Sequence, residues 1–94
     1  MILACTEAGE GPPLILLHGL FGAGQNWGAI RKALAPRFRV LAPDLRNHGA
    51  SPHDADMSYA AMAADVAETM DAAGIPRAAV LGHSMGGKVA MTLA

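Results

Sequence analysis

AAVLGHSMGGKVA, residues 78–90, joins an apolar run to a glycine-rich turn and the start of a helical pattern. Residues 82–86 within it, GHSMG, follow the G-x-S-x-G pattern, which sets a nucleophilic serine on a sharp turn between a strand and a helix. Residues 82–88 also carry the spacing G-x-x-x-x-G-K of a phosphate-binding loop. The two patterns predict different chemistry, acyl transfer in one case and nucleotide binding in the other.

Some features of the sequence favour the phosphate-loop interpretation and others oppose it. Lys88 is correctly spaced, and the apolar run that ends at Asp44 looks like a strand presenting a magnesium-binding carboxylate. The pattern, however, needs a serine or threonine hydroxyl after the lysine to bind Mg²⁺, and this chain has Val89. The carboxylate also precedes the loop, whereas in most proteins of this class it follows. A P-loop nucleotide binder is therefore kept only as a remote alternative.

The serine interpretation explains more residues. Gly82 and Gly86 stand two positions either side of Ser84, where a crowded turn needs small residues. The Ser84 hydroxyl would then be exposed at the N-terminus of the next helix, where N–H groups and the helix dipole stabilise a developing oxyanion. We predict Ser84 as the catalytic nucleophile and the Met85 N–H as one oxyanion donor.

A second oxyanion donor is expected in residues 18–22, HGLFG, which follow the apolar run LILL. We predict the Leu20 N–H as this donor, with the Phe21 N–H as the alternative. His18 is interpreted as a residue that fixes the loop, and the Phe21 side chain either lines an acyl pocket or packs on the loop. The residues expected to support the site are His18, Gly19, Phe21, His83, Gly82 and Gly86.

Three short apolar runs alternate with helical patterns, and each run has the continuous apolar character of a strand buried on both faces. The runs are residues 12–19, 38–43 and 78–83, and a short fourth strand is predicted near residues 1–5. Helices are predicted over residues 27–35 with Asn26 as N-cap, over residues 59–73 with Ser58 as N-cap, and from Met85 onward. This order predicts an α/β fold, a parallel sheet with helices on both faces and a site at the carboxyl ends of the strands.

The second predicted helix is amphipathic. Its apolar stripe consists of Tyr59, Met62, Ala63, Val66, Met70 and Ala73. The acidic residues Asp65, Glu68 and Asp71 fall outside that stripe. The stripe predicts one face of the helix packed on the sheet.

The composition of the chain limits the classes of molecule that it can be expected to bind. The net charge is −1 with scattered basic residues, which argues against nucleic acid or an anionic membrane as a partner. The single cysteine, Cys5, excludes a disulfide within the chain and is typical of a reducing, cytoplasmic compartment. His48 and His53 with Asp54 or Asp56 form no compact ligand motif, so we expect no metal site.

Four segments together resemble a known family. They are LILLHGLFGAGQNW, LAPDLRNHGASPH, MSYAAMAADV and VLGHSMGGKVAMTLA, and they are similar to the α/β-hydrolase superfamily, specifically its small carboxylesterases related to α/β-hydrolase domain-containing protein 11 and bacterial YbfF. The resemblance covers nearly the whole chain. It implies hydrolysis of a small ester or thioester by a serine–histidine–acid triad, with no cofactor. Ser84 matches the nucleophile of such enzymes, and Leu20 and Met85 match the oxyanion donors.

Residues 44–51 match the D-x-R-G-x-G-x-S loop of related hydrolases, with Asn47 in place of its first glycine. This departure is mild, because Asn tolerates a left-handed backbone better than other non-glycine residues. We interpret Asp44, Arg46 and Asn47 as groups that fix this loop rather than catalytic groups.

The rest of the triad is missing. In this fold the acid and the histidine follow the serine, yet no Asp, Glu or His follows Ser84. All four histidines precede it: His18, His48, His53 and His83. His83 is adjacent to the serine and its side chain should point away, while His48 or His53 would have to meet the strict geometry of a base.

We therefore expect residues 1–94 to be the N-terminal portion of a single α/β-hydrolase domain, with the lid and C-terminal strands absent. The parent would be a serine esterase acylated on Ser84, and the 94 residues alone would be catalytically incomplete. The alternative is a non-catalytic fragment or interaction module. The sequence does not distinguish hydrolysis from acyl transfer, because the exclusion of water from the site depends on the lid. The sequence leaves the oligomeric state and the substrate open.

Overall fold

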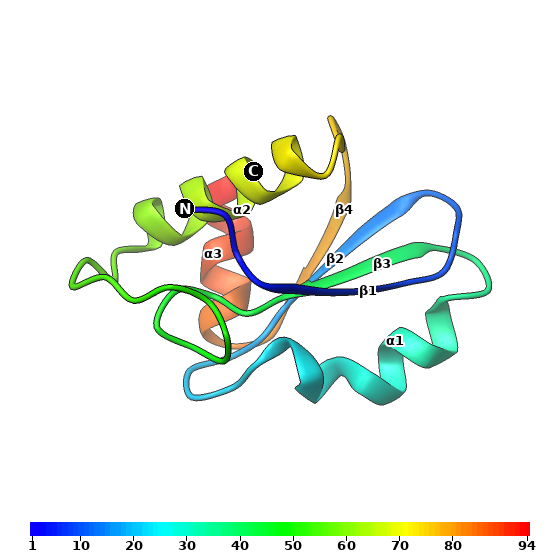
Figure 1. Ribbon diagram of the computed structural model, residues 1–94, viewed down its shortest axis with the longest axis horizontal. Helices are drawn as coiled ribbons and strands as arrows, with labels where there is room; N and C mark the ends of the chain where they lie inside the picture. The colour runs from blue at the N-terminus through cyan, green and yellow to red at the C-terminus, as the bar shows by residue number, and fades with distance from the viewer.

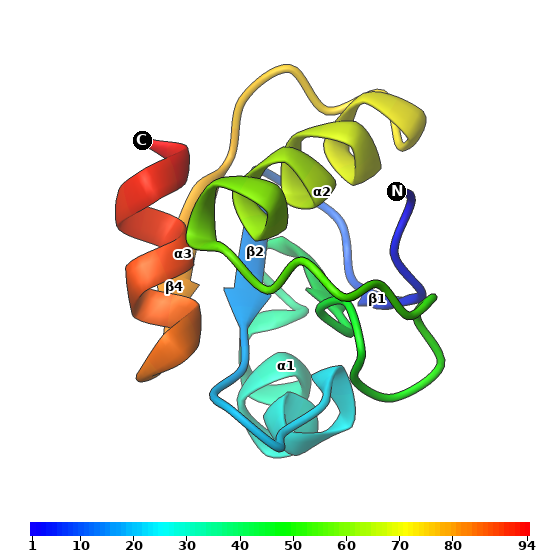
Figure 2. The ribbon, with the colours of Figure 1, turned by 90° about the vertical axis from the view of Figure 1, so that its left-hand side faces the viewer.

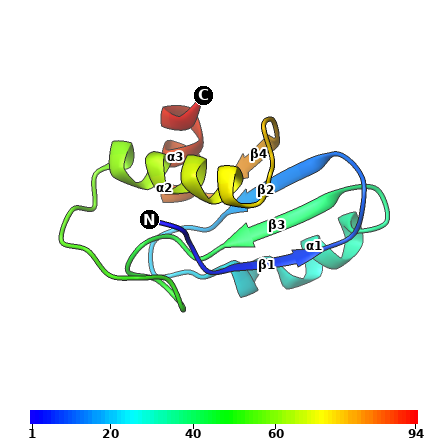
Figure 3. The ribbon, with the colours of Figure 1, turned by 45° about the horizontal axis from the view of Figure 1, so that its top comes forward.

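A computed structural model describes all 94 residues and contains a four-stranded sheet with the strand order β1-β3-β2-β4 (Figure 3). The strands are β1 (Cys5–Ala8), β2 (Pro13–Leu17), β3 (Arg39–Pro43) and β4 (Ala79–Gly82). β2 pairs in parallel with both β3 and β4, which confirms the predicted parallel arrangement for these three strands, although the whole sheet is mixed. β1 starts at Cys5 instead of lying over residues 1–5, and it runs antiparallel to β3.

Helices cover both faces of the sheet, as the alternation of strands and helices predicts (Figure 2). α2 (Tyr59–Ala72) and α3 (Met85–Leu93) lie on one face. The short 3-10 helix η1 (Gly24–Trp27) and α1 (Gly28–Leu34) lie on the other. The predicted α/β layer architecture is therefore confirmed.

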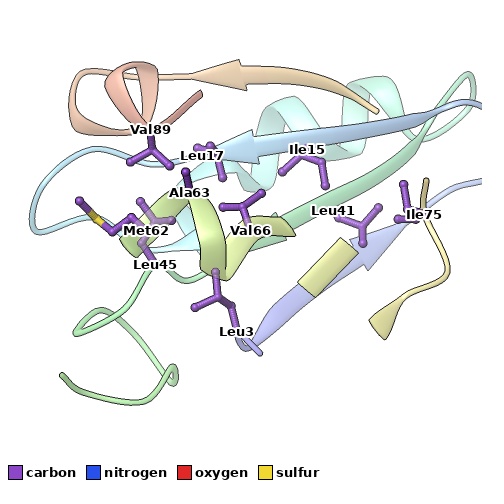
Figure 4. Packing of buried hydrophobic residues seen from close by; sticks show 10 residues of the cluster. All are labelled: Leu3, Ile15, Leu17, Leu41, Leu45, Met62, Ala63, Val66, Ile75 and Val89. Atoms are coloured by element: carbon purple, nitrogen blue, oxygen red, sulfur yellow. The ribbon is translucent and has the colours of Figure 1, made fainter. Parts of the chain in front are cut away.

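Successive residues of the strands face opposite sides of the sheet and fill two cores. The larger core lies between the sheet and α2 with α3, and Figure 4 shows its members: Leu3, Ile15, Leu17, Leu41, Leu45, Met62, Ala63, Val66, Ile75 and Val89. The smaller core contains Leu16, Val40 and Ala42, and Trp27 and Leu34 pack against it. Burial on both faces explains why the strand sequences are continuously apolar.

The helix predicted at residues 27–35 begins later than expected. Residues 24–27 form η1, and α1 starts at Gly28 with Trp27 before it. Asn26 does not cap α1, because its Oδ1 accepts a hydrogen bond from the Ala23 N–H at 2.6 Å and so closes the preceding turn. Short polar side chains often bond to the nearby backbone in this way, in competition with a helix cap.

α2 matches its prediction closely. Ser58 Oγ accepts a hydrogen bond from the Ala61 N–H at 3.1 Å, and Met62 and Val66 of the apolar stripe are buried. Tyr59 at the first turn is the exception, because its ring faces α3 and lies 5.8 Å from the Nζ of Lys88. Asp65, which lies outside the apolar stripe, is nevertheless buried, since an arginine from another segment reaches it.

β4 lies at one edge of the sheet. It pairs with β2 along one side, and Leu81 on this strand is 46% exposed.

None of the helices has the length and apolar character needed to cross a bilayer. No cluster of three or more His, Cys, Asp or Glu side chains has a geometry suited to a metal ion.

Candidate active site

The segments that follow β2, β3 and β4 gather at one end of the sheet, at the left of Figure 1. They meet there because parallel strands present their carboxyl ends at a common edge. Residues 18–21 and 82–86 hold the predicted site residues, and residues 44–58 run beside them (Figure 1). The sequence-predicted candidates therefore share one region of the molecule.

Ser84 stands on a strained turn. Its φ is 55° and its ψ is −113°, a backbone conformation that side chains other than glycine rarely adopt. Such strain costs on the order of 1–3 kcal/mol and is found mainly at functional sites. The side chain is exposed, and its Oγ makes no hydrogen bond within the chain. The hydroxyl is thus available to a bound molecule.

Two glycines make this turn sterically feasible. A Cβ on Gly82 would lie 2.3 Å from the carbonyl oxygen of Gly86, and a Cβ on Gly86 would lie 2.2 Å from that of Leu17. Both distances are far inside van der Waals contact with backbone atoms. A Cβ on Gly87 would find its nearest neighbour at 3.5 Å, which is ordinary contact. Only the first two glycines are required by packing.

The same geometry argues against a phosphate-binding loop. Only His83 and Ser84 separate the end of β4 from the start of α3. A phosphate loop needs a longer glycine-rich segment whose N–H groups wrap around the anion. Lys88, the residue that would bind phosphate, lies beside the Tyr59 ring.

A cleft of about 460 Å³ opens beside Ser84. Its lining consists of His18, Gly19, Leu20, Phe21, Gly22, Asn26, Trp27, Ile30, His83 and Ser84. Gly19 lies close to the serine, since a Cβ there would be 3.5 Å from the Ser84 Cβ. The Phe21 side chain is 91% exposed at the mouth of the cleft. The cleft therefore brings together the two segments predicted to form the site.

A larger groove of about 800 Å³ lies elsewhere, between α2, β4 and α3. Most of its lining is apolar, and its only charged residues are Asp71 and Arg77. It contains no nucleophilic side chain and none of the predicted site residues. The cleft beside Ser84 is therefore the better candidate for chemistry, although it is the smaller one.

The Leu20 and Met85 N–H groups, both predicted as oxyanion donors, have no acceptor within the chain. The Met85 N–H is the first of α3, and the first N–H groups of a helix have no intrahelical partner. The Phe21 N–H, the alternative donor, is already used, because it donates to His48 Nε2 at 3.1 Å. Of the two alternative donors, only the Leu20 N–H is therefore without an acceptor.

His18 and His48 are buried and bonded to the backbone. His18 Nε2 accepts from the Leu45 N–H at 2.9 Å, and its Nδ1 lies 2.7 Å from the Gly19 carbonyl oxygen. A ring that accepts through one nitrogen and donates through the other is neutral. Burial lowers the pKa of His18 below its ordinary value, the hydrogen bond to Gly19 opposes that shift, and the neighbouring His48 adds to it.

None of the four histidines forms a hydrogen bond with Ser84. His18 and His48 are held by backbone groups, and His53 and His83 are exposed. A general base must come within hydrogen-bonding reach of the hydroxyl that it deprotonates. No histidine of the chain is therefore hydrogen-bonded to Ser84 in this arrangement.

The segment 44–58 is fixed by its polar side chains, as predicted. Asp44 accepts hydrogen bonds from the N–H groups of Gly24 at 2.6 Å and Ala50 at 3.0 Å. Asn47 has a φ of 65° and bonds twice to the backbone of Asp54, at 2.7 and 2.8 Å. The loop-fixing interpretation of Asp44 and Asn47 is confirmed.

The sequence did not reveal the partner of Arg46. Its guanidinium donates two hydrogen bonds to Asp65 on α2, at 2.6 and 2.8 Å, and Asp65 is 1% exposed. Burial on its own raises the pKa of Asp65, but the hydrogen bonds from Arg46 and from the Met1 ammonium outweigh it and hold that pKa below its usual value. The only sign of this ion pair in the sequence was an acidic residue, Asp65, flanked by buried positions of its helix.

These features define the class of protein: the chain belongs to the α/β-hydrolase fold family, whose profile matches residues 12–94. It is 52% identical over 86 residues to the sn-1-specific diacylglycerol lipase ABHD11 of Xenopus laevis, a match covering 89% of this chain and 28% of that protein. It is 47% identical over 81 residues to the esterase YbfF of Escherichia coli strain K12, covering 86% of this chain and 32% of YbfF.

A solved structure shows the same backbone arrangement. The marine microorganism esterase superimposes with a TM-score of 0.96 at 47% identity, over 98% of this chain and 36% of that one. The chain thus spans about a third of the length of the proteins it matches.

Proposed function

We propose that these 94 residues supply the nucleophile and the oxyanion hole of a serine hydrolase that acts on small ester or thioester substrates. The observation that carries the proposal is the exposed, unbonded Ser84 hydroxyl on a strained turn beside a cleft. The Leu20 and Met85 N–H groups near it lack acceptors. The esterase and lipase names of the relatives support the same chemistry.

In the proposed reaction, Ser84 Oγ attacks the carbonyl carbon of the substrate and loses its proton to a base. The carbonyl electron pair moves to oxygen, and the resulting oxyanion accepts hydrogen bonds from the Leu20 and Met85 N–H groups. The intermediate collapses, the protonated base gives its proton to the departing alcohol or thiol, and an acyl-serine remains. Water then cleaves this ester by the same steps, with acyl transfer to another acceptor as the variant.

The base and its acid are proposed to come from residues outside these 94. No histidine within the chain bonds to Ser84, and the chain covers 28% of the ABHD11 relative. We accordingly infer that residues 1–94 form the N-terminal portion of one α/β-hydrolase domain, to which further strands and a lid would belong. The free thiol of Cys5 favours a reducing, cytoplasmic location.

The alternative is a non-catalytic fragment or interaction module, favoured by the missing base. Ester turnover separates the two, measured on the full-length gene product and on the purified 94-residue chain. We expect turnover by the full-length gene product that disappears in its Ser84→Ala variant, and none by the 94-residue chain beyond weak residual catalysis. A gene product that continues in frame with Asp or Glu and then His supports the enzyme. Full-length protein without turnover supports the module.

A further inference from the structure

His18 and His48 form a reciprocal link between two loops. His18, from the loop after β2, accepts a hydrogen bond from the Leu45 N–H in the segment after β3. His48, from that second segment, accepts one from the Phe21 N–H in the first loop. Their ring centroids lie 4.9 Å apart. The two loops are therefore joined by a pair of imidazoles that each accept a hydrogen bond from a backbone N–H.

The bond to Phe21 acts at a strained position. The Gly22 N–H donates to the Gly19 carbonyl at 3.0 Å, so residues 19–22 form a hydrogen-bonded turn. Within that turn only Phe21 has a positive φ, 62°, which is the pattern of a type II turn. Glycine or asparagine normally fills that position, because a bulky side chain is strained there. Something outside the turn must hold Phe21 in this conformation.

His48 is suited to hold it, because it is itself anchored. Its Nδ1 donates to the Arg46 carbonyl oxygen at 2.8 Å, and the ring is 8% exposed. Arg46 in turn is bound to the buried Asp65 of α2. A chain of contacts thus runs from the helix layer to the Phe21 N–H.

We propose that His48 is a positioning residue that holds the Leu20–Phe21 segment in its strained turn and so aims the Leu20 N–H at the substrate carbonyl. This inference rests on the proposed serine hydrolase function. Without an acceptor at the Nε2 position, the peptide between Leu20 and Phe21 can rotate and return Phe21 to a negative φ. The Leu20 N–H belongs to the preceding Gly19–Leu20 peptide, whose direction is no longer fixed once the turn changes, and the oxyanion would lose part of its stabilisation.

Two substitutions separate the two nitrogens of His48. In His48→Asn the side-chain amide can replace Nδ1 and donate to the Arg46 carbonyl, but it is too short to reach the Phe21 N–H. In His48→Gln the amide oxygen can replace Nε2 and accept from Phe21, while the contact to Arg46 is lost. Both are made in the full-length gene product, and kcat, KM and Tm are measured with a p-nitrophenyl ester.

We expect His48→Asn to lower kcat about ten- to hundredfold with a smaller change in KM, because a misplaced donor acts mainly on the transition state. His48→Gln should retain a kcat close to that of the original protein even if its Tm is lower. If His48 had a merely structural role, the variant with the lower Tm would also have the lower kcat. In the Phe21→Gly background, where a positive φ costs nothing, His48→Asn should lower kcat much less.

Three results would overturn the inference in distinguishable ways. If His48→Asn leaves kcat unchanged while Ser84→Ala abolishes turnover, the positioning role is wrong and the proposed function stands. If kcat of both His48 variants follows their Tm, the role of His48 is structural only. If the original protein has no turnover that depends on Ser84, the proposed function fails, and this inference fails with it.

Discussion

Gly86 and Leu17 are in direct backbone contact: a Cβ on Gly86 would lie 2.2 Å from the Leu17 carbonyl oxygen. The first turn of α3 is therefore packed against the end of β2. Ser84, two residues before Gly86, is placed by this contact beside the loop that follows β2. The position of the proposed nucleophile thus depends on Gly86, which has no Cβ and can therefore approach the Leu17 carbonyl so closely.

Substitution of these glycines tests that contact. Gly86→Ala and Gly82→Ala should each lower the free energy of unfolding by at least the roughly 1–3 kcal/mol typical of overpacking, because the atoms they meet are backbone. Gly87→Ala is the matched control and should be neutral or stabilising by about 0.5–1 kcal/mol, since it lies in a helix with room for a methyl group. Urea unfolding of the full-length gene product measures all three. If the Gly86→Ala and Gly87→Ala variants are equally stable, the close backbone contact between Gly86 and Leu17 is wrong.

Asp65 and Arg46 form the buried ion pair that ties the segment after β3 to α2. Asp65→Asn leaves the Arg46 guanidinium buried without its charged partner, and we expect a loss of about 3–5 kcal/mol in unfolding free energy. Glu68→Gln is the control, because Glu68 is exposed and bonds only to the Met1 ammonium. That change should cost no more than about 1 kcal/mol. Similar losses in the two variants, measured by urea unfolding, would argue against a structural role for the pair.

His18 predicts a dependence of stability on pH. Its pKa is below the ordinary 6.5 in the folded chain, so the unfolded state takes up a proton first as the pH falls. Its contribution to stability is therefore full above the unfolded pKa and is lost as pH decreases from that value toward the folded one. His18→Gln should show a smaller decrease in unfolding free energy between about pH 7 and about pH 5. His53→Gln, at an exposed position, should keep the original slope, and an unchanged slope in His18→Gln would count against this account.

Asn47 has a left-handed backbone and two side-chain bonds to Asp54. Asn47→Ala loses both bonds and also places an ordinary side chain at a positive φ. Asn47→Gly loses the same bonds but adopts that φ without strain. We expect the alanine variant to be less stable than the glycine variant by about 1–2 kcal/mol in thermal unfolding. The reverse order would show that the backbone conformation at this position is different.

Local patterns predicted most of the fold. The strand around Leu16 and the helix behind Ser58 follow from apolar runs and capping residues, which are short-range signals. The burial of Asp65 could not be predicted, because it depends on Arg46, 19 residues earlier in the chain. The predicted N-cap of α1 was wrong, since Asn26 instead closes the preceding turn.

The candidate site was predicted by motif at Ser84 and Leu20, whose chemical roles stay predictions. The link between His48 and the Phe21 N–H was not predicted, because it joins two loops that follow different strands. Such contacts form only when the sheet brings these loops to one edge, so no local pattern records them. The long-range polar contacts are the part that required the structure.

The proposed function requires Ser84 to be an activated nucleophile. The most direct measurement is covalent labelling of the full-length gene product with a fluorophosphonate, followed by peptide mass spectrometry. We expect a single phosphonyl adduct on Ser84, no labelling of the Ser84→Ala variant, and normal labelling of Ser58→Ala, whose hydroxyl only caps α2. An intact, folded protein that takes up no label, or that is labelled equally after Ser84→Ala, would show that Ser84 is not the nucleophile.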